Sequence, residues 1–277
     1  AIFSGHPIRN LYIYYFKGHL APGTNLSHND FIGNWQEEEF SFLFFSAPSE
    51  KLVEQLLAVQ PQLSLLDNFH MTYDDWQGGK LVPIRVGRFL IAPPWDKIWN
   101  QAADKEIIPL IIDPGVVFGN GSHATTHNCL EALELLFQNS TPQSTLDLGT
   151  GTGLLALAAA RLGCKQTLAV DTNFLATTAA QANIRSNHMQ DRIVVVQGHA
   201  EDIIYFQADL VIANIHYEVM KKLISSQGFF DKKWFILSGL LRNQANDIAD
   251  SLSQGSVSII KKWNCDGVWH TFLGKIS

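Results

Sequence analysis

TLDLGTGTGLL, at residues 145–155, is the stretch that decides the fold of this chain. An apolar segment runs into three glycines at alternate positions, and an alanine-rich segment follows at once. Glycines at a strand-to-helix turn let the backbone approach a ligand closely, and the start of the helix offers free N–H groups. The next apolar segment ends at Asp171, about 20 residues beyond the glycines, where a carboxylate can accept both hydroxyls of a ribose. Together these signals predict a nucleoside site on an α/β sheet.

The spacing of the glycines indicates which nucleoside is bound. A dinucleotide fingerprint requires a third glycine at position 154, but Leu154 stands there and the glycine is at 153. With Asp147 two residues before the loop, the pattern instead resembles the first motif of S-adenosylmethionine (SAM)-dependent methyltransferases. That resemblance implies that the loop approaches the amino-acid part of SAM and that Asp171 holds the ribose. A tight turn without any ligand and a nicotinamide enzyme remain as weaker alternatives.

Composition describes an ordinary globular protein. A length of 277 residues is enough for one large domain and a smaller one. The residues are 46% hydrophobic and 17% charged, as in most globular proteins. The net charge of −6 disfavours broad nucleic-acid binding and suits a basic partner. We expect no membrane segment and no signal peptide, because neither pattern is present. The three cysteines lie far apart without metal-ligand spacing, so we expect no metal site and a cytoplasmic location.

From about residue 143 onward, strand and helix patterns alternate, which favours a parallel sheet covered on both faces. The expected strands are 144–149, 166–171, 192–197, 208–213 and 233–238. The expected helices are 154–162, 174–187 and 240–252. Alternating segments at 256–263 and 268–276 flank Cys265-Asp266-Gly267, a hairpin signal. We therefore predict an α/β fold with a Rossmann-like, mostly parallel class I methyltransferase sheet and a C-terminal antiparallel hairpin.

The front of the chain has a different character and predicts a small α/β domain at 1–76. Within it, 11–16 and 40–45 are expected strands, 49–59 is an expected helix, and 18–34 is polar and rich in Gly and Asn. Residues 77–83 form the expected joint. The second domain, 77–277, is expected to begin with a β-hairpin at 86–112, whose two strands are 86–92 and 107–112.

Residues 113–126 read DPGVVFGNGSHATT and look like a signature of PrmA, the ribosomal protein L11 methyltransferase family. Further similarity lies at 81–95, 213–215 and 237–245, so the resemblance covers about 81–277. It implies methyl transfer from SAM to protein amines of ribosomal protein L11, namely lysine ε-amines or the N-terminal α-amine, with release of S-adenosylhomocysteine. The pattern departs from that of the family at Val117, where the family has Ala, and at Asn120, where it has Thr.

The resemblance also implies roles for single residues. The family's cofactor contacts, carried onto matching positions, are Thr126, Gly149, Asp171 and Asn214. Gly151 belongs to the same glycine loop, and Phe118 and His123 are expected to flank the crevice. Asn214, at the end of a strand, is the expected catalytic residue, which would orient the acceptor amine without a strong general base.

The family's front domain has a ferredoxin-like β-α-β-β-α-β layout and binds the ribosomal protein. In this chain only its second half, from about Trp35 to Trp76, matches easily. The acceptor could therefore be another protein lysine or a small amine, and a non-catalytic SAM-binding protein is the alternative from a different class. His216 and Tyr217 either line the acceptor pocket or form a surface turn. His123 and His127 have the spacing of a helical pair, but too few carboxylates lie near them in the sequence to complete a zinc site. A serine hydrolase is poorly supported, because the chain has no Gly-x-Ser-x-Gly element.

Overall fold

The computed structural model describes residues 8–24, 26, 28–100, 106–253 and 255–277. It separates into a smaller unit, 1–81 with 173–175, and a larger unit, 82–172 with 176–277. The division after Leu81 lies inside the expected joint at 77–83. Residues 1–7 of the expected front domain and 101–105 of the expected hairpin at 86–112 lie outside the described residues.

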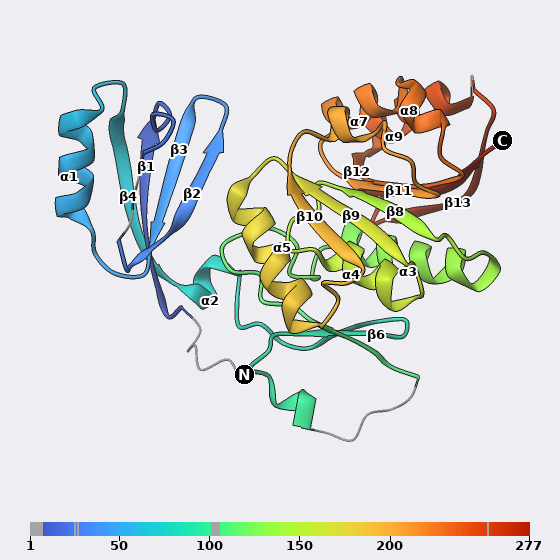
Figure 1. Ribbon diagram of the computed structural model, residues 1–277, viewed down its shortest axis with the longest axis horizontal. Coiled ribbons are helices and arrows are strands. Elements are labelled where there is room, and N and C mark those ends of the chain that lie inside the picture. Colours follow the sequence, from blue (N-terminus) through green and yellow to red (C-terminus); the bar gives the residue numbers. More distant parts are fainter. Residues whose placement is uncertain (1–7, 25, 27, 101–105, 254) are drawn as a thin grey trace. The chain divides into compact units, whose positions relative to one another are not determined.

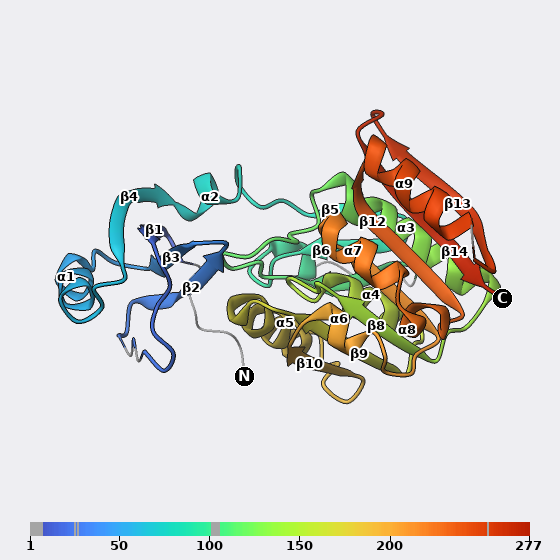
Figure 2. The same cartoon turned by 90° about the horizontal axis from the view of Figure 1, so that it is seen from above.

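The larger unit is built on a sheet with the strand order β10-β9-β8-β11-β12-β14-β13 (Figure 1). Its strands are β8 (Ser144–Leu148), β9 (Gln166–Asp171), β10 (Ile193–Gln197), β11 (Leu210–Asn214), β12 (Trp234–Leu241), β13 (Val257–Cys265) and β14 (Trp269–Ile276). The first five strands pair in parallel, β14 runs antiparallel to β12, and β13 runs antiparallel to β14. This arrangement confirms the expected mostly parallel sheet with an antiparallel hairpin at its edge (Figure 2).

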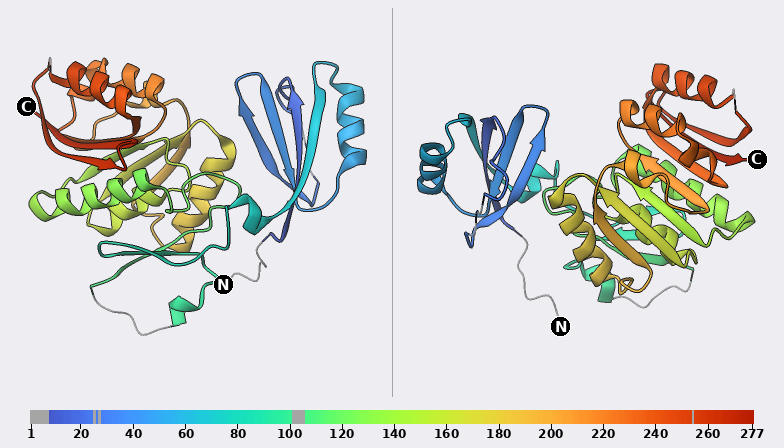
Figure 3. Two further views of the ribbon diagram at one scale, coloured as in Figure 1. Left: turned by 180° about the vertical axis from the view of Figure 1, so that it is seen from behind. Right: turned by 45° about the horizontal axis from the view of Figure 1, so that its top comes forward.

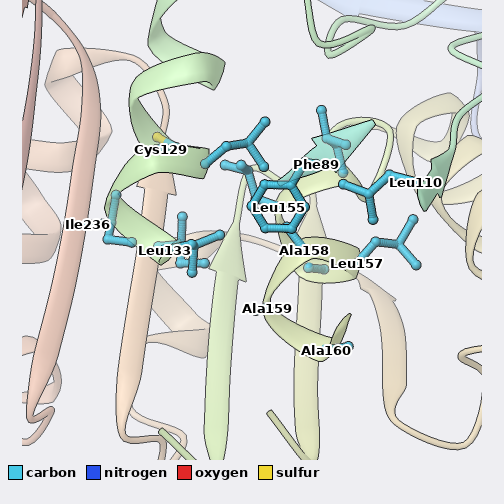
Figure 4. Packing of buried hydrophobic residues seen from close by; sticks show 14 of the residues in the cluster. Phe89, Leu110, Cys129, Leu133, Leu155, Leu157, Ala158, Ala159, Ala160 and Ile236 are labelled. Carbon is cyan, nitrogen blue, oxygen red and sulfur yellow. The ribbon is translucent and has the colours of Figure 1, made fainter. Parts of the chain in front are cut away.

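Helices cover both faces of this sheet because its strands are apolar on both faces. In β11, Leu210 and Ile212 pack in one buried cluster, and Val211 and Ala213 pack in the other. The first cluster lies under the helices α3 (Ala124–Asn139) and α4 (Leu154–Arg161), as Figure 4 shows for part of it. The second lies under α7 (Tyr217–Ile224) and α9 (Arg242–Ser253). The remaining helices of the sheet are α5 (Phe174–Ser186), α6 (Ala200–Ile203) and α8 (Gln227–Phe230).

Most expected elements of the larger unit are confirmed to within a few residues. The helix expected at 240–252 begins later, as α9 at Arg242, because β12 continues to Leu241. The hairpin turn lies at 266–268, between the paired Cys265 and Trp269, and it has positive φ at Asp266 (50°) and Gly267 (69°). Its closing hydrogen bond runs from the Val268 N–H to the Cys265 carbonyl at 3.0 Å.

The β-hairpin expected at 86–112 is wrong. Strand β6 (Phe89–Ala92) pairs in parallel with β7 (Ile108–Ile111), and parallel strands cannot form a hairpin. Parallel pairing requires a crossover connection, and its described part includes the 3₁₀ turn η1 (Lys97–Asn100). The true hairpin joins β5 (Ile84–Val86) to β6 through Gly87-Arg88, a two-residue turn with a positive-φ glycine first.

The smaller unit is an antiparallel sheet in the order β2-β3-β1-β4 with one long helix, α1 (Glu50–Val59), along one face (Figure 3). Its strands are β1 (Asn10–Lys17), β2 (Phe31–Glu37), β3 (Phe40–Phe45) and β4 (Ser64–Thr72), and the short α2 (Tyr73–Trp76) follows. Tyr14, Phe16, Leu43 and Phe45 pack against α1. This strand order is that of a ferredoxin-like fold. The first helix of that fold would lie between β1 and β2, but the described residues of 18–30 form no helix. The strands expected at 11–16 and 40–45 and the helix at 49–59 are confirmed.

Among the described residues, no helix combines the length and the apolar character that crossing a membrane would require.

Candidate functional site

The glycine loop after β8 has a backbone that only glycine adopts easily. Gly149, Gly151 and Gly153 have φ values of 72°, 55° and 81°. A Cβ on Gly149 would collide with the side chain of Ile215, and one on Gly151 would lie 2.8 Å from the Phe118 carbonyl oxygen. The loop is therefore closely packed between two segments, one before the sheet and one after β11.

Asp171 lies at the end of β9, directly beside this loop. Its Oδ2 accepts a hydrogen bond from the Gly151 N–H at 3.0 Å. The N–H groups of Gly149 and Thr150 donate to the Val170 carbonyl at 2.8 and 2.9 Å, so the loop folds over the end of β9. The structure thus brings together the glycines of 149–153 and the carboxylate of Asp171, as their spacing in the sequence predicts.

The segment 113–123 approaches the same loop from the other side. Thr152 Oγ1 donates to the Gly119 carbonyl at 2.7 Å, and Asn183 Nδ2 donates to the carbonyls of Asp113 and Thr152 at 3.0 and 2.9 Å. The Phe118 side chain is 59% exposed, and its ring meets the His123 ring edge-on at 5.6 Å. These contacts hold an exposed aromatic ring and an imidazole next to the glycine loop.

The helix α3 begins at this crevice and carries two of the expected site residues. His123 caps the helix, because its Nδ1 accepts the Thr125 N–H at 3.3 Å. Thr126, in the first turn, is 3% exposed, and its N–H donates to the His123 carbonyl at 3.0 Å. Asn214, at the end of β11, donates from Nδ2 to Thr125 Oγ1 at 3.3 Å. The expected site residues therefore gather at the carboxyl ends of β8, β9 and β11, where α/β sheets bind ligands.

Comparison with known proteins agrees with this geometry. Residues 42–276 match the family described as ribosomal protein L11 methyltransferase (PrmA). The chain belongs to this family. It is 40% identical over 184 residues to the ribosomal protein L11 methyltransferase of Desulfitobacterium hafniense, which covers 65% of this chain. It is 29% identical over 238 residues to that of Alkaliphilus oremlandii, which covers 82% of this chain. The chain spans 57% and 74% of the lengths of these two relatives.

A solved PrmA relative shows the same fold. The crystal structure of the ribosomal protein L11 methylase from Lactobacillus delbrueckii subsp. bulgaricus superposes with a TM-score of 0.62 at 29% sequence identity. The match covers 70% of this chain and 98% of that one.

The two departures from the PrmA signature are accommodated locally. Asn120 Oδ1 accepts hydrogen bonds from the Ser122 N–H at 2.9 Å and from Ser122 Oγ at 2.6 Å, so its side chain folds the loop on itself. Val117 is 6% exposed and packs inward. Neither side chain displaces Gly119 from its hydrogen bond with Thr152.

Several residues at this candidate site were not expected from the sequence. Thr125, which is 2% exposed, joins His123 to Asn214, and the Trp269 ring meets the His123 ring at 5.1 Å. Ser238 Oγ donates to the Thr125 carbonyl at 3.4 Å and lies 2.6 Å from Thr271 Oγ1. Thr125 lies within the quoted signature, but the contributions of β12 and β14 depend on how the sheet is completed.

Two other expectations concern side chains near the site. Tyr217 begins α7, and its hydroxyl donates to the Asp247 carboxylate of α9, so it links two helices. Among the described residues, no three His, Cys, Asp or Glu side chains gather as a metal ion would need.

Asp147 supports the PrmA glycine loop from beneath. It is 2% exposed, and its Oδ2 accepts hydrogen bonds from Thr150 Oγ1 at 2.6 Å and from the Ala156 N–H at 3.1 Å. Burial raises the pKa of this carboxyl to about 6, although the two hydrogen bonds oppose the shift. The residue thus shapes the turn and the start of α4.

This raised pKa predicts a pH dependence of stability. The folded state holds the proton of Asp147 more tightly than the unfolded state, whose pKa is near 3.9. The stabilisation is therefore fully present below about pH 4 and is lost as the pH rises to about 6, on the order of 3 kcal/mol. We expect Asp147→Asn to remove this component. Urea unfolding of both proteins between pH 4 and pH 7 measures it, and parallel stability profiles would contradict the prediction.

Proposed function

We propose that this protein binds SAM at the carboxyl ends of β8, β9 and β11 and transfers its methyl group to amines of ribosomal protein L11, releasing S-adenosylhomocysteine. The observation that carries the proposal is the closure of the family signature at 113–126 on the glycine loop, with Asp171 and Asn214 at its two sides. Membership of the PrmA family and the names of its relatives support the reaction and the acceptor.

The residues of the crevice suit SAM better than a nucleotide. Neither 113–126 nor 145–155 contains a lysine or arginine, so the two loops offer no cation to a phosphate. Asp171, at the end of β9, offers a carboxylate to the ribose hydroxyls, and Gly149 and Gly151 bring the backbone close to the amino-acid part. Thr126 in the first turn of α3 would donate its hydroxyl to the carboxylate of that part, and Phe118 and His123 would flank it.

The proposed reaction does not require a strong general acid or base from the protein. When bound, SAM supplies a methyl group that its sulfonium already makes electrophilic. The chain must align the acceptor amine with that methyl group, and alignment of two reactants can supply about 7–11 kcal/mol. The amine must also be neutral, and a free lysine has a pKa of about 10.4, which desolvation lowers. Asn214 would accept a hydrogen bond from an N–H of the amine, so that the lone pair of the amine nitrogen points toward the methyl group.

The acceptor is proposed to be a lysine ε-amine or the N-terminal α-amine of ribosomal protein L11. Several relatives carry that protein in their names, and the net charge of −6 suits a basic partner. The smaller unit is proposed as the substrate-recognition domain, and a cytoplasmic location follows from a ribosomal substrate. The loop at 18–30, which replaces the first helix of a ferredoxin-like layout in its described residues, favours a second candidate, another protein lysine or a small amine.

Transfer of a labelled methyl group distinguishes these acceptors. We expect radioactivity from methyl-labelled SAM to appear in purified ribosomal protein L11, and mass spectrometry of its peptides to identify lysine or N-terminal methylation. The same reaction with whole-cell lysate provides the comparison. Label in another band alone would reject L11 as the acceptor, and tight SAM binding without transfer to any acceptor would indicate a non-catalytic protein.

A further inference from the structure

Three residues of the site form a short hydrogen-bonded chain that the roles described above leave unexplained. Asn214 Nδ2 lies 3.3 Å from Thr125 Oγ1, which lies 2.7 Å from His123 Nδ1. The Thr125 hydroxyl is buried, so both contacts replace hydrogen bonds to water. This series of hydrogen bonds begins at the cap of α3 and ends at Asn214, at the end of β11.

The direction of each hydrogen bond in this chain follows from the backbone of α3. The Thr125 N–H points at His123 Nδ1, so that nitrogen must be an acceptor without a proton of its own. The Thr125 hydroxyl therefore donates its single proton to His123 Nδ1. Its oxygen can then only accept from the third member of the chain, so the Asn214 group that faces it must be the NH₂ group. A proton on His123 Nδ1 would place its N–H against the Thr125 N–H, and a flipped Asn214 amide would place Oδ1 against the Thr125 oxygen.

This assignment determines where the amide oxygen of Asn214 lies. With Nδ2 held by Thr125, Oδ1 occupies the other position of the planar amide, beside Gly239. A Cβ on Gly239 would lie 3.2 Å from Oδ1, so the glycine leaves the oxygen without a neighbouring side chain on that side. Gly239 has a φ of 84°, which also favours glycine there.

Thr125 is itself held in place from the sheet. Ser238 of β12 donates to its carbonyl at 3.4 Å, and Thr271 of β14 lies 2.6 Å from the Ser238 hydroxyl. Burial, and to a lesser extent His127, lowers the pKa of His123 and so favours the neutral imidazole, and the Thr125 N–H selects the tautomer whose Nδ1 carries no proton. The hydroxyl and the backbone of Thr125 are thus both held by hydrogen bonds.

From these contacts we propose that Thr125 is a positioning residue for methyl transfer, whose hydroxyl turns the Asn214 amide so that Oδ1 accepts an N–H of the acceptor amine. This rests on the proposed function, because it assigns Asn214 to that amine. Thr125 itself would touch neither the cofactor nor the acceptor. Its loss would let the amide rotate, and it would slow transfer without weakening SAM binding.

Thr125→Val tests this, because valine keeps the shape of threonine and removes the hydroxyl. We expect kcat to fall about 10- to 100-fold, as small misplacements of a reacting group do, with the dissociation constant for SAM unchanged. Thr125→Ser should retain wild-type kcat. Thr167→Val, which removes a buried hydroxyl from β9, is the matched control. Unchanged kcat in Thr125→Val would overturn the proposal, and Thr125→Ala provides the same test if the valine variant does not fold.

A double-mutant cycle shows whether Thr125 acts through Asn214. If it does, Thr125→Val should slow Asn214→Ala no further, since the amide is already absent. Effects on kcat that multiply would place Thr125 in another role and overturn the proposal.

A spectroscopic reading separates this inference from the proposed function. In ¹⁵N-labelled protein, the side-chain NH₂ signals of Asn214, assigned by their absence in Asn214→Ala, should shift in Thr125→Val and stay in place in Thr125→Ser. If no acceptor is methylated, the proposed function fails while these signals still test the hydrogen bond. Unchanged signals in Thr125→Val would overturn the inference even in an active enzyme.

Discussion

Asp171→Ala should bind SAM at least 100-fold more weakly than the wild-type protein. Two hydrogen bonds from ribose hydroxyls to a carboxylate contribute about 1.5–3 kcal/mol each, and both would be lost. The same change removes the acceptor for the Gly151 N–H, so the glycine loop would also lose a contact that shapes it. Isothermal titration calorimetry with SAM measures the effect directly.

Three companion variants sharpen this test. Asp171→Asn keeps one carbonyl oxygen and should lose less affinity than Asp171→Ala. Gly149→Arg should abolish binding, since its Cβ would collide with the Ile215 side chain and the long side chain would enter the crevice. Asp191→Ala removes an exposed carboxylate away from the glycine loop and should bind normally. Undiminished SAM binding in both Asp171→Ala and Gly149→Arg would end the assignment of the crevice to SAM.

Asn214→Ala should lower kcat about 100-fold while weakening SAM binding less than tenfold. Orientation of the acceptor is lost in the transition state, and misplacement of a reacting group costs about that much. Removal of one neutral hydrogen bond costs about 1 kcal/mol, or roughly fivefold in affinity, which sets an upper limit for the effect of this variant on SAM binding. Single-turnover transfer at saturating SAM, with calorimetry on the same preparation, separates the two quantities.

Asn139→Ala is the matched control for this variant, because Asn139 is exposed at the other end of α3 and its side chain bonds only a nearby carbonyl. If the transfer rate of Asn214→Ala falls only as much as the fraction of enzyme with bound SAM, Asn214 contributes to cofactor binding and not to orientation of the amine.

The geometry of the proposed nucleoside side of the site was predictable because its signals are local. The glycines, Asp147 and Asp171 lie within one strand–loop–helix–strand unit, and the structure joins Gly151 to Asp171 as the spacing required. The acceptor side was only partly predictable. Thr125 and Asn214 are 89 positions apart, and Trp269 reaches His123 only because β14 inserts between β12 and β13. No sequence period reports such a contact.

The errors in the fold have physical causes of the same kind. The strands β6 and β7 resemble a hairpin pair in sequence, but the true turn, Gly87-Arg88, lay near the start of the expected strand at 86–92. In the smaller unit, β2 and β4 are edge strands whose residues are mostly half-buried or exposed. Edge strands carry less apolar alternation than central ones. For this reason the sequence pattern did not identify most of β2 or of β4 as a strand.

The insertion of β14 beside β12 has a consequence for how the protein matures. The hydrogen bonds that hold the glycine loop lie within residues 113–183, whereas the support of Thr125 spans 113 positions to Ser238 and a further 33 to Thr271. Long-range contacts of this kind form late in folding. We therefore expect a molecule whose last two strands have not docked to bind SAM while Thr125 remains unsupported, and to gain transfer activity only when β14 pairs with β12.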